Sequence, residues 1–255
     1  MSGDAAAGRG GCLNQWPDTQ VEAPHQPKPV VAGKTDVIGL FGGTFDPVHH
    51  GHLRAAVELC DLLRLDDLRL LPCHRPSHRG APGASTPERV QMLELATRGV
   101  PGVSIDTRES QRDKPSYSVD TLQSFRDEYP QACLLFLMGE DAFNGFKRWH
   151  RWERILELAH LVVMHRPRYR LEGDAEMLYR QRQMSDLQRV VQGENEFAGR
   201  ILLQPISQID ISATAIRELI ANQRSIRYLV PETVREYILS KGLYRDTDPN
   251  EKQDH

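Results

Sequence analysis

Short apolar runs alternate with longer amphipathic stretches through most of this chain. Runs that lack polar residues are typical of strands buried on both faces, and apolar residues three or four positions apart are typical of the helices that cover such strands. The predicted strands span 37–41, 68–71, 103–105, 133–138 and 161–164. The predicted helices span 51–64, 87–98, 119–129, 155–158 and 231–241, with a further one around 176–191.

The alternation of strand and helix predicts a parallel sheet with helices on both faces and right-handed crossovers. The expected fold class is therefore α/β, with a Rossmann-like doubly wound sheet. In such sheets, ligands bind beyond the carboxyl ends of the strands. Three segments follow predicted strands and are expected along that edge, namely 42–52, 139–141 and 211–217.

The length and composition favour one domain. The chain has 255 residues, of which 39% are hydrophobic, and we expect a single α/β domain over 36–245. Residues 1–35 offer almost nothing to bury, so they are predicted to be a disordered extension or the product of an over-long gene model. Residues 246–255 are predicted to be a disordered tail. The polar segment 166–200 is expected to be a peripheral insertion.

Charge and cysteine content exclude several classes of protein. The formal net charge of −3 argues against a protein that coats nucleic acid. No apolar run approaches the length of a signal-peptide core or a membrane span, so no membrane association is expected. The four cysteines form no C-x-x-C pair, and a chain of this length does not need disulfides. These features favour a cytoplasmic protein with reduced cysteines. They are compatible with a homo-oligomer.

The segment after the first predicted strand carries the strongest chemical signal. It reads Gly-Gly-Thr-Phe-Asp-Pro-Val-His-His-Gly-His from position 42 to position 52. Gly42 and Gly43 let the backbone approach a ligand, and the following helix turns its free amides and positive dipole end toward an anion. His49 and His52 share one face of the first helical turn, whereas His50 points away from it. This segment predicts a pocket for a nucleotide phosphate.

A second anion-binding segment lies at 211–217. Ser212 is placed to cap a helix, Thr214 adds a hydroxyl, and Arg217 falls in the second turn. A hydroxyl cap beside free amides attracts phosphate, and a guanidinium can bind two oxygens at once. Taken alone, this segment also fits an ordinary capped helix, and each histidine of the first segment fits a packing role. The interpretation therefore depends on the joint pattern.

Both segments resemble signatures of the adenylyl- and cytidylyltransferases whose catalytic fold is similar to that of class I aminoacyl-tRNA synthetases. The first matches G-x-F-D-P-x-H-x-G-H without a mismatch, from Gly43 to His52. The second resembles I-S-[SA]-T-x-[IL]-R, with Ala213 in place of the commoner serine. Asp46 is expected to orient the turn before Pro47.

Three further segments narrow the resemblance to the bacterial nicotinate-nucleotide adenylyltransferases, over about 37–245. The segment 71–79 is similar to a loop that lies over the nucleotides in that family. The segment 115–122 resembles the family's P-S-Y-[TS]-x-x-T-L element at the pyridine pocket. The segment 139–149 is similar to the family's G-x-D followed by a tryptophan that stacks on the pyridine ring, although His150 stands where some relatives have a tyrosine.

The resemblance implies transfer of the adenylyl group of ATP to nicotinate mononucleotide, which yields nicotinate adenine dinucleotide and pyrophosphate. The attacking group is already a phosphate anion, so His49, His52 and Arg217 are expected to align and stabilise phosphates rather than to act as a general base. Mg²⁺ is expected to enter with ATP, without a metal site on the protein. The other expected ATP- and phosphate-binding residues are Gly42, Gly43, Thr44, Phe45, Gly139, Asp141, Arg166, Ser212 and Thr214. The expected pyridine-nucleotide-binding residues are His78, Arg79, Ser118 and Trp149.

Several alternatives compete with this interpretation. A zinc site at Cys73, His74 and His78 is disfavoured because no fourth ligand lies at a standard spacing. Among enzymes, one alternative is an adenylyltransferase that prefers nicotinamide mononucleotide. Another is a relative that uses phosphopantetheine or a cytidylyl donor, and the segments 71–79 and 115–122 argue against both of these. A nucleotide-binding regulator without turnover is the alternative from another class. Synthetase-like activation for tRNA is disfavoured by the short chain and its net charge.

Overall fold

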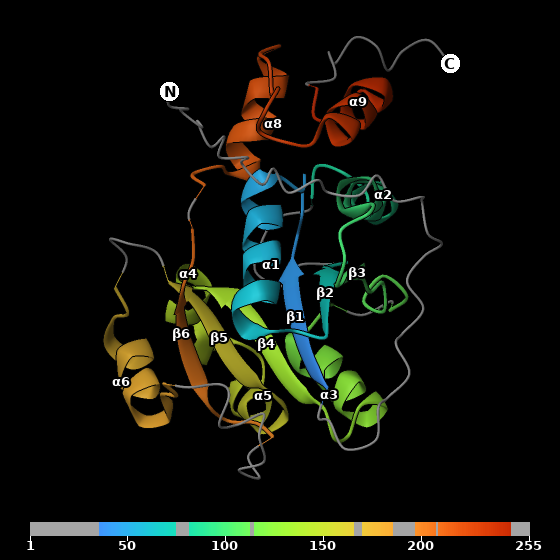
Figure 1. The fold of residues 1–255 in the computed structure, drawn as a ribbon. Coiled ribbons are helices and arrows are strands. Elements are labelled where there is room, and N and C mark those ends of the chain that lie inside the picture. Colours follow the sequence, from blue (N-terminus) through green and yellow to red (C-terminus); the bar gives the residue numbers. More distant parts are fainter. Residues whose placement is uncertain are drawn as a thin grey trace, which may run out of the picture.

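The computed structural model describes residues 36–74, 82–112, 115–165, 170–185, 197–207 and 209–245. The predicted extension 1–35, the predicted tail 246–255 and the predicted site residues His78, Arg79 and Arg166 lie outside these ranges. The strands of the described part are β1 (Val37–Gly43), β2 (Asp67–Pro72), β3 (Val103–Ile105), β4 (Cys133–Gly139), β5 (His160–His165) and β6 (Ile201–Pro205) (Figure 1).

These strands form one parallel sheet in the order β3-β2-β1-β4-β5-β6. In the central strand β1, Phe41 lies opposite Leu70 of β2 on one side and Leu137 of β4 on the other. The chain builds outward from β1 to β3 and then restarts beside β1 with β4. The predicted Rossmann-like α/β sheet is confirmed, and its topological switch point lies between the carboxyl ends of β1 and β4.

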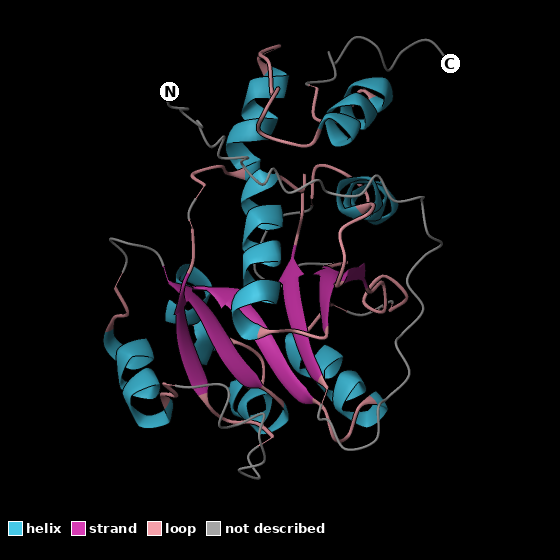
Figure 2. Cartoon of the chain, viewed as in Figure 1, coloured by secondary structure: helices cyan, strands magenta, loops and turns pink. Residues whose placement is uncertain are grey.

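Helices cover both faces of the sheet (Figure 2). Helices α1 and α2 bury their apolar residues in one core cluster, and α3 and α5 bury theirs in a second cluster on the opposite face. The helices of the described residues are α1 (His50–Leu63), α2 (Thr86–Thr97), α3 (Ser118–Glu128), α4 (Glu140–Asn144), α5 (Trp152–Leu158), α6 (Gly173–Arg182), α8 (Ala213–Ala221) and α9 (Glu232–Lys241), with a 3-10 helix at Phe146–Arg148.

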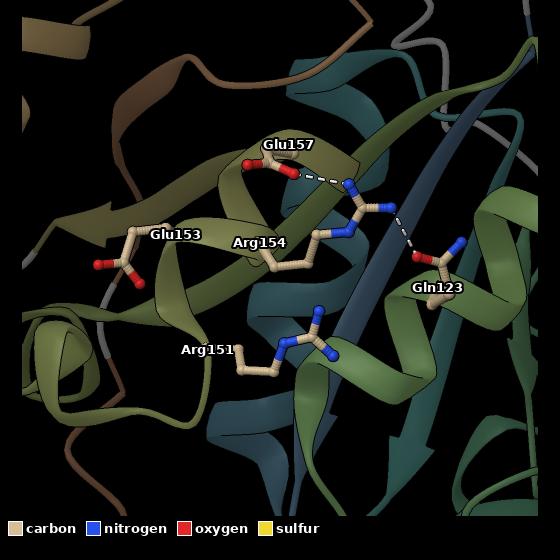
Figure 3. Close-up of a pocket in the computed structure, with 5 residues that line it drawn as sticks. All are labelled: Gln123, Arg151, Glu153, Arg154 and Glu157. Atoms are coloured by element: carbon tan, nitrogen blue, oxygen red, sulfur yellow. Dashed lines mark hydrogen bonds and ion pairs between the residues drawn. The ribbon is translucent and has the colours of Figure 1, made fainter.

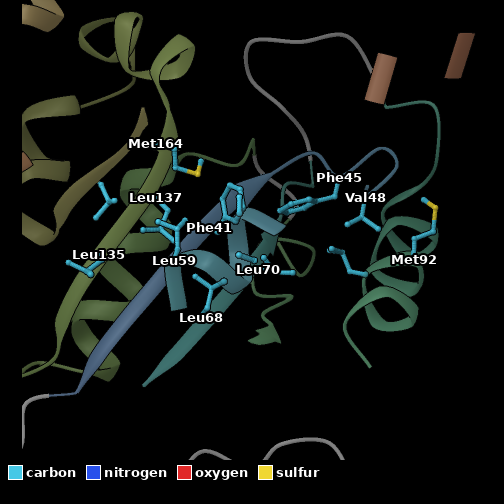
Figure 4. Close-up of a cluster of buried hydrophobic side chains, with 14 of the residues drawn as sticks. Phe41, Phe45, Val48, Leu59, Leu68, Leu70, Met92, Leu135, Leu137 and Met164 are labelled. Atoms are coloured by element: carbon cyan, nitrogen blue, oxygen red, sulfur yellow. The ribbon is translucent and has the colours of Figure 1, made fainter. Parts of the chain in front are cut away.

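Strand β4 shows why the sheet is buried on both faces. Successive side chains of a strand point to opposite faces. Leu135 and Leu137 therefore belong to the cluster under α1 (Figure 4). Leu134 and Phe136 belong to the cluster under α3. All four side chains are buried. Each buried leucine contributes about 1.5–3 kcal/mol of transfer free energy, which explains the fully apolar runs in the sequence.

The last two helices lie beyond the carboxyl end of β1. Helix α8 stands above the N-terminal end of α1, and α9 lies near α2 (Figure 1). Ile216 of α8 and Val234 of α9 are fully buried in the same cluster as α1 and α2. The hydroxyl of Thr233 also donates a hydrogen bond to the backbone oxygen of Leu95, at 3.3 Å. The C-terminal part of the chain is therefore docked directly above the predicted phosphate-binding turn.

The helix predicted around 176–191 has different bounds in the structure. Helix α6 covers Gly173–Arg182, so it begins earlier than predicted and ends well before 191. It ends because Gln183 pairs with Ile201 at the start of β6, and the backbone N–H of Met184 donates to the Ile201 oxygen at 2.8 Å. Sheet pairing therefore overrides helix propensity at this point.

Candidate active site

The turn between β1 and α1 is tight and is fixed by its own aromatic side chain. Phe45 adopts a left-handed backbone conformation, with φ of 50°, and the following Asp46–Pro47 peptide bond is cis. The Phe45 ring is buried and packs edge-on against Phe41, with ring centroids 5.9 Å apart. A β-carbon at Gly43 would lie only 2.8 Å from the tip of the Phe45 ring. Glycine is therefore required at position 43 by the turn itself.

The first two peptide groups after β1 direct their amides toward the switch point. The Gly43 oxygen accepts a hydrogen bond from the Cys73 amide at 2.9 Å, and the Thr44 oxygen accepts one from the Arg89 guanidinium at 2.7 Å. A trans peptide group directs its N–H opposite to its C=O. The amides of Thr44 and Phe45 therefore point away from β2 and α2, to the side where an anion is expected.

His49 and His52 stack on each other at the start of α1. His49 is the N-cap residue and His52 lies three residues later, and their ring centroids are 3.7 Å apart at an interplanar angle of 25°. The backbone N–H of His49 donates to Nδ1 of His52 at 3.4 Å. Because Nδ1 of His52 accepts a hydrogen bond, its proton is assigned to Nε2. The Nε2–H group of His52 is thus a hydrogen-bond donor.

Both imidazoles are neutral at neutral pH. Burial, together with a smaller contribution from the neighbouring His49, lowers the pKa of His52 to about 3. Burial lowers the pKa of His49 to about 4, with a smaller contribution from His50. Within the described residues, Nδ1 of His49 is buried without a hydrogen-bond partner. A buried nitrogen that lacks a partner costs about 1–3 kcal/mol.

Arg217 reaches the same turn from α8. Ser212 caps this helix as predicted, because its hydroxyl accepts the Ala215 amide at 3.0 Å. Nη1 of Arg217 donates to the backbone oxygen of Asp46 at 2.6 Å, and Nη2 donates to the hydroxyl of Thr214 at 3.2 Å. A residue 171 positions away in the sequence is thereby brought to the turn that carries the two histidines.

The predicted role of Asp46 in orienting its turn agrees with its contacts. Asp46 is only 4% exposed, and its carboxylate accepts the backbone amides of Gly83, at 2.7 Å, and Ala84, at 3.0 Å. It also accepts the hydroxyl of Tyr244 at 2.7 Å. Tyr244 was not among the predicted site residues. The feature of the sequence that could have indicated it is the apolar pair Leu243-Tyr244, which comes directly after the glycine that ends α9.

Arg89 is a second residue that the sequence analysis missed. It is fully buried, and its guanidinium donates to the backbone oxygen of Thr44 at 2.7 Å and to the hydroxyl of Thr86 at 2.9 Å. Arg89 therefore holds the turn from below, at the first turn of α2. The signal in the sequence was its position three and four residues before Met92 and Leu93, on the buried face of that helix.

The other predicted nucleotide contacts lie at the ends of β4 and its neighbours. Gly139 ends β4, and a β-carbon there would lie 2.6 Å from a carboxylate oxygen of the exposed Asp141. Ser118 is the first residue of α3. Trp149 is half-buried beside Phe136, with ring centroids 6.2 Å apart. The structure therefore places these residues beyond the carboxyl end of the sheet or at the start of a helix, with the indole backed by the core.

A buried carboxylate at this edge was also not anticipated. Glu140 follows Gly139 directly and is fully buried, and its carboxylate pairs with Nδ1 of His165 at 2.6 Å. His165 is the last residue of β5. The pair links the ends of two neighbouring strands, and it gives this rim of the sheet a fixed geometry.

A hollow of about 450 Å³ lies elsewhere, between α3 and α5 (Figure 3). Its lining is polar, and Arg154 is held by Glu157 at 2.6 Å and by Gln123 at 2.9 Å. The Arg154 guanidinium is thus already engaged within this hollow, and none of the lining residues belongs to the two motifs. We therefore place the candidate site at the β1–α1 turn and not in this hollow.

The described residues contain neither a metal-binding cluster nor a helix that could cross a membrane. No group of three or more His, Cys, Asp or Glu side chains in these ranges is arranged to hold a metal ion. In the same part of the chain, none of the helices combines the length and apolar character that crossing a membrane requires.

The sequence of this chain is similar to those of a known enzyme family. The family model described as cytidylyltransferase-like matches residues 40–219. A relative from Pseudomonas paraeruginosa, named a probable nicotinate-nucleotide adenylyltransferase, is 47% identical over 215 residues, which cover 82% of this chain and 97% of the relative. A relative of the same name from Aeromonas hydrophila is 44% identical over 213 residues, with coverage of 82% and 97%.

A solved structure supports the fold. The Plasmodium falciparum nicotinic acid mononucleotide adenylyltransferase complexed with NaAD matches with a TM-score of 0.62 at 17% sequence identity, over 82% of this chain and 97% of that one. At this identity the match concerns the fold alone. The family model and the relatives that this chain covers almost completely give the assignment: the chain belongs to the cytidylyltransferase-like family and, within it, to the nicotinate-nucleotide adenylyltransferases.

Proposed function

We propose that this protein transfers the adenylyl group of ATP to nicotinate mononucleotide, a step in NAD biosynthesis. A phosphate oxygen of the mononucleotide attacks the α-phosphorus of ATP and forms a new P–O bond. The bond from that phosphorus to the α,β-bridging oxygen breaks, and its electron pair leaves with pyrophosphate. The attacking oxygen is already anionic, so the reaction needs neither an enzyme nucleophile nor a general base.

The two histidines supply hydrogen bonds rather than positive charge to the resting site. The hydrogen bond from the His49 backbone occupies Nδ1 of His52 and leaves the Nε2–H group of His52 for a ligand. The stacked His49 ring keeps the His52 ring in place. When a triphosphate binds, its negative charge raises the pKa of both imidazoles and strengthens these bonds. Preorganised donors of this kind stabilise the charge that develops on the transferred phosphate.

Arg217 brings the permanent positive charge. Two of its five N–H groups are used by Asp46 and Thr214, which leaves three for the β- and γ-phosphates. The amides of Thr44 and Phe45 are proposed to bind the phosphate of the mononucleotide. Arg166, which lies outside the described residues, is proposed to assist at the triphosphate. The nucleotide enters as its Mg²⁺ complex, in which the ion keeps several waters and takes triphosphate oxygens.

The pyridine nucleotide is proposed to bind beside Trp149 and the start of α3. An indole face can hold a planar pyridine ring, and the hydroxyl and amide of Ser118 can bind the carboxylate of nicotinate. His78 and Arg79, outside the described residues, are proposed to cover the nucleotides. A cytoplasmic location is proposed as well, because the described cysteines at 60, 73 and 133 are free thiols.

The observation that carries the proposal is the convergence of His49, His52 and Arg217 on one turn at the switch point of the sheet. The test is pyrophosphate release by the purified chain, with ATP or CTP as donor and nicotinate mononucleotide, nicotinamide mononucleotide or phosphopantetheine as acceptor. We expect ATP with nicotinate mononucleotide to exceed every other pair by at least about tenfold in kcat/KM. A faster reaction with another pair would replace the proposed substrate. ATP binding without pyrophosphate release from any pair would favour the regulator.

A further inference from the structure

Three segments that are distant in the sequence meet at the carboxylate of Asp46. One oxygen accepts the Ala84 amide and the Tyr244 hydroxyl, and the other accepts the Gly83 amide. The second oxygen also lies 3.7 Å from Nη1 of Arg217. The carboxylate is therefore surrounded by donors, and the guanidinium is the most distant of them.

Tyr244 is held in place from both sides. It follows Gly242, which ends α9 in a left-handed conformation, and the Leu243 amide donates to the Ile238 oxygen at 3.1 Å. Its ring packs on Gly83, where a β-carbon would lie 3.0 Å from the ring. Burial and the adjacent Asp46 carboxylate raise the pKa of Tyr244 well above its usual range. The phenol thus stays protonated and acts as the donor to Asp46.

The contacts of Arg217 depend on how well this carboxylate is satisfied. At present Nη1 donates to the backbone oxygen of Asp46 at 2.6 Å, and its separation from the carboxylate is too long for a hydrogen bond. Without the Tyr244 hydroxyl, the carboxylate would lose a short hydrogen bond while remaining buried. The nearest flexible donor is the Arg217 guanidinium, which could close the gap and form a direct ion pair.

We propose that Tyr244 is a positioning residue for adenylyl transfer: its hydroxyl satisfies the Asp46 carboxylate and so keeps the Arg217 guanidinium available for the triphosphate of ATP. The proposal rests on the function assigned above to Arg217. Tyr244 itself touches neither substrate in this scheme. It acts through Asp46.

The test is a double-mutant cycle with Tyr244→Phe and Arg217→Ala. The probe is the α,β-methylene analogue of ATP, whose binding is measured by calorimetry, together with steady-state kinetics. We expect Tyr244→Phe to weaken analogue binding by about tenfold and to raise the KM for ATP, with the KM for nicotinate mononucleotide unchanged. In the Arg217→Ala background, the same change is expected to have no further effect. Tyr237→Phe, in helix α9 seven residues before Tyr244, is the matched control and is expected to behave as the wild type.

Two results would overturn the proposal. Equal losses from Tyr244→Phe with and without Arg217 would assign Tyr244 a purely structural role, and so would an unchanged analogue affinity in the single variant. The Tyr244→Phe variant retains the ring that packs on Gly83, and melting curves show whether each variant is folded. For a variant with a low melting temperature, analogue binding is compared at about 10 °C. Analogue binding does not depend on the acceptor, so the cycle can be read even if nicotinate mononucleotide is not the substrate.

Discussion

The His49 imidazole occupies the space beside Gly51: a β-carbon at Gly51 would lie 3.0 Å from its Nδ1. The same β-carbon would lie 3.3 Å from the backbone oxygen of Ile209, so it could not be accommodated by a shift in that direction. The small residue in the H-x-G-H pattern therefore makes room for the first histidine, which then stacks on the second.

Gly51→Ala tests this contact. Replacing glycine by alanine inside a helix normally stabilises it by about 1 kcal/mol. Here we expect no gain in melting temperature, because the His49 ring has to move, and a loss of turnover of at least about tenfold, because misplaced catalytic groups are costly. Wild-type turnover combined with a raised melting temperature would show that the position of the His49 ring does not matter.

His52→Ala removes the proposed donor to the reacting phosphate. We expect kcat to fall by about a hundredfold or more, by comparison with the loss of one preorganised charge-stabilising donor. The melting temperature is expected to change little, because the ring is only half-buried and the hydrogen bond that its Nδ1 accepts from the His49 backbone is long, at 3.4 Å. His50→Ala is the matched control, since His50 is one residue from His49 but lies outside the proposed site. Similar losses in both variants would indicate a local folding defect.

The fold could be predicted from the sequence because its strands carry an unambiguous signal. Fully apolar runs such as 133–138 occur where a parallel sheet is covered on both faces. The alternation of strands with helices limits the possible strand orders to a few. The bounds of α6 could not be predicted, because they depend on the pairing of Gln183 with Ile201, a contact between distant segments. Periodicity reports local structure and is insensitive to such contacts.

The motifs of the site were predictable, but the residues that support them were not. His49, His52 and Arg217 belong to ordered patterns, and the structure brings them to one turn. Arg89 and Tyr244 belong to no such pattern, because their roles arise from single contacts with the turn across 45 and 198 residues. Only the folded chain shows which polar side chains such a turn requires.

The low pKa values of the stacked histidines predict a loss of stability in mild acid. The pKa of His49 is about 4 and that of His52 about 3 in the folded protein, against about 6.5 for an unfolded chain. Between these values the unfolded chain binds more protons, so the free energy of unfolding falls as the pH falls from 7 toward 4. At pH 5 the loss is about 2 kcal/mol per histidine.

Urea unfolding at pH 7.5 and pH 5 measures this loss, and His52→Gln isolates its origin. The variant lacks one titrating group, so the decrease in its free energy of unfolding between the two pH values is expected to be smaller than that of the wild type by about 2 kcal/mol. Carboxylates also titrate in this range, but they contribute equally to both proteins. Parallel pH profiles for the two proteins would contradict a neutral His52 with a lowered pKa.

Arg89→Met tests the support beneath the turn. Methionine retains much of the apolar volume, but the backbone oxygens of Thr44 and Ala84 lose the donors that satisfy them. We expect a destabilisation of about 2–4 kcal/mol, measured by urea unfolding, because buried acceptors would be left unpaired. Arg98→Met, which changes an exposed arginine just after the same helix, is the control and is expected to change stability by less than about 0.5 kcal/mol. Equal stabilities of the two variants would remove Arg89 from this role.

Trp149→Ala separates the two substrate sites. Trp149 is backed by Phe136 and Phe146, so one part of the indole is fixed against the core while the residue remains half-buried. Removing it is expected to raise the KM for nicotinate mononucleotide by about tenfold, the equivalent of one lost stacking contact of about 1–1.5 kcal/mol, and to leave the KM for ATP nearly unchanged.

Trp152→Ala is the matched control, because Trp152 packs on the same Phe146 ring at 5.9 Å but has no proposed contact with the substrate. Both variants lose aromatic packing, so both are expected to melt at lower temperature, and only Trp149→Ala is expected to discriminate between the substrates. If the two KM values rise together in Trp149→Ala, or if Trp152→Ala shows the same selective rise, the pyridine ring binds elsewhere.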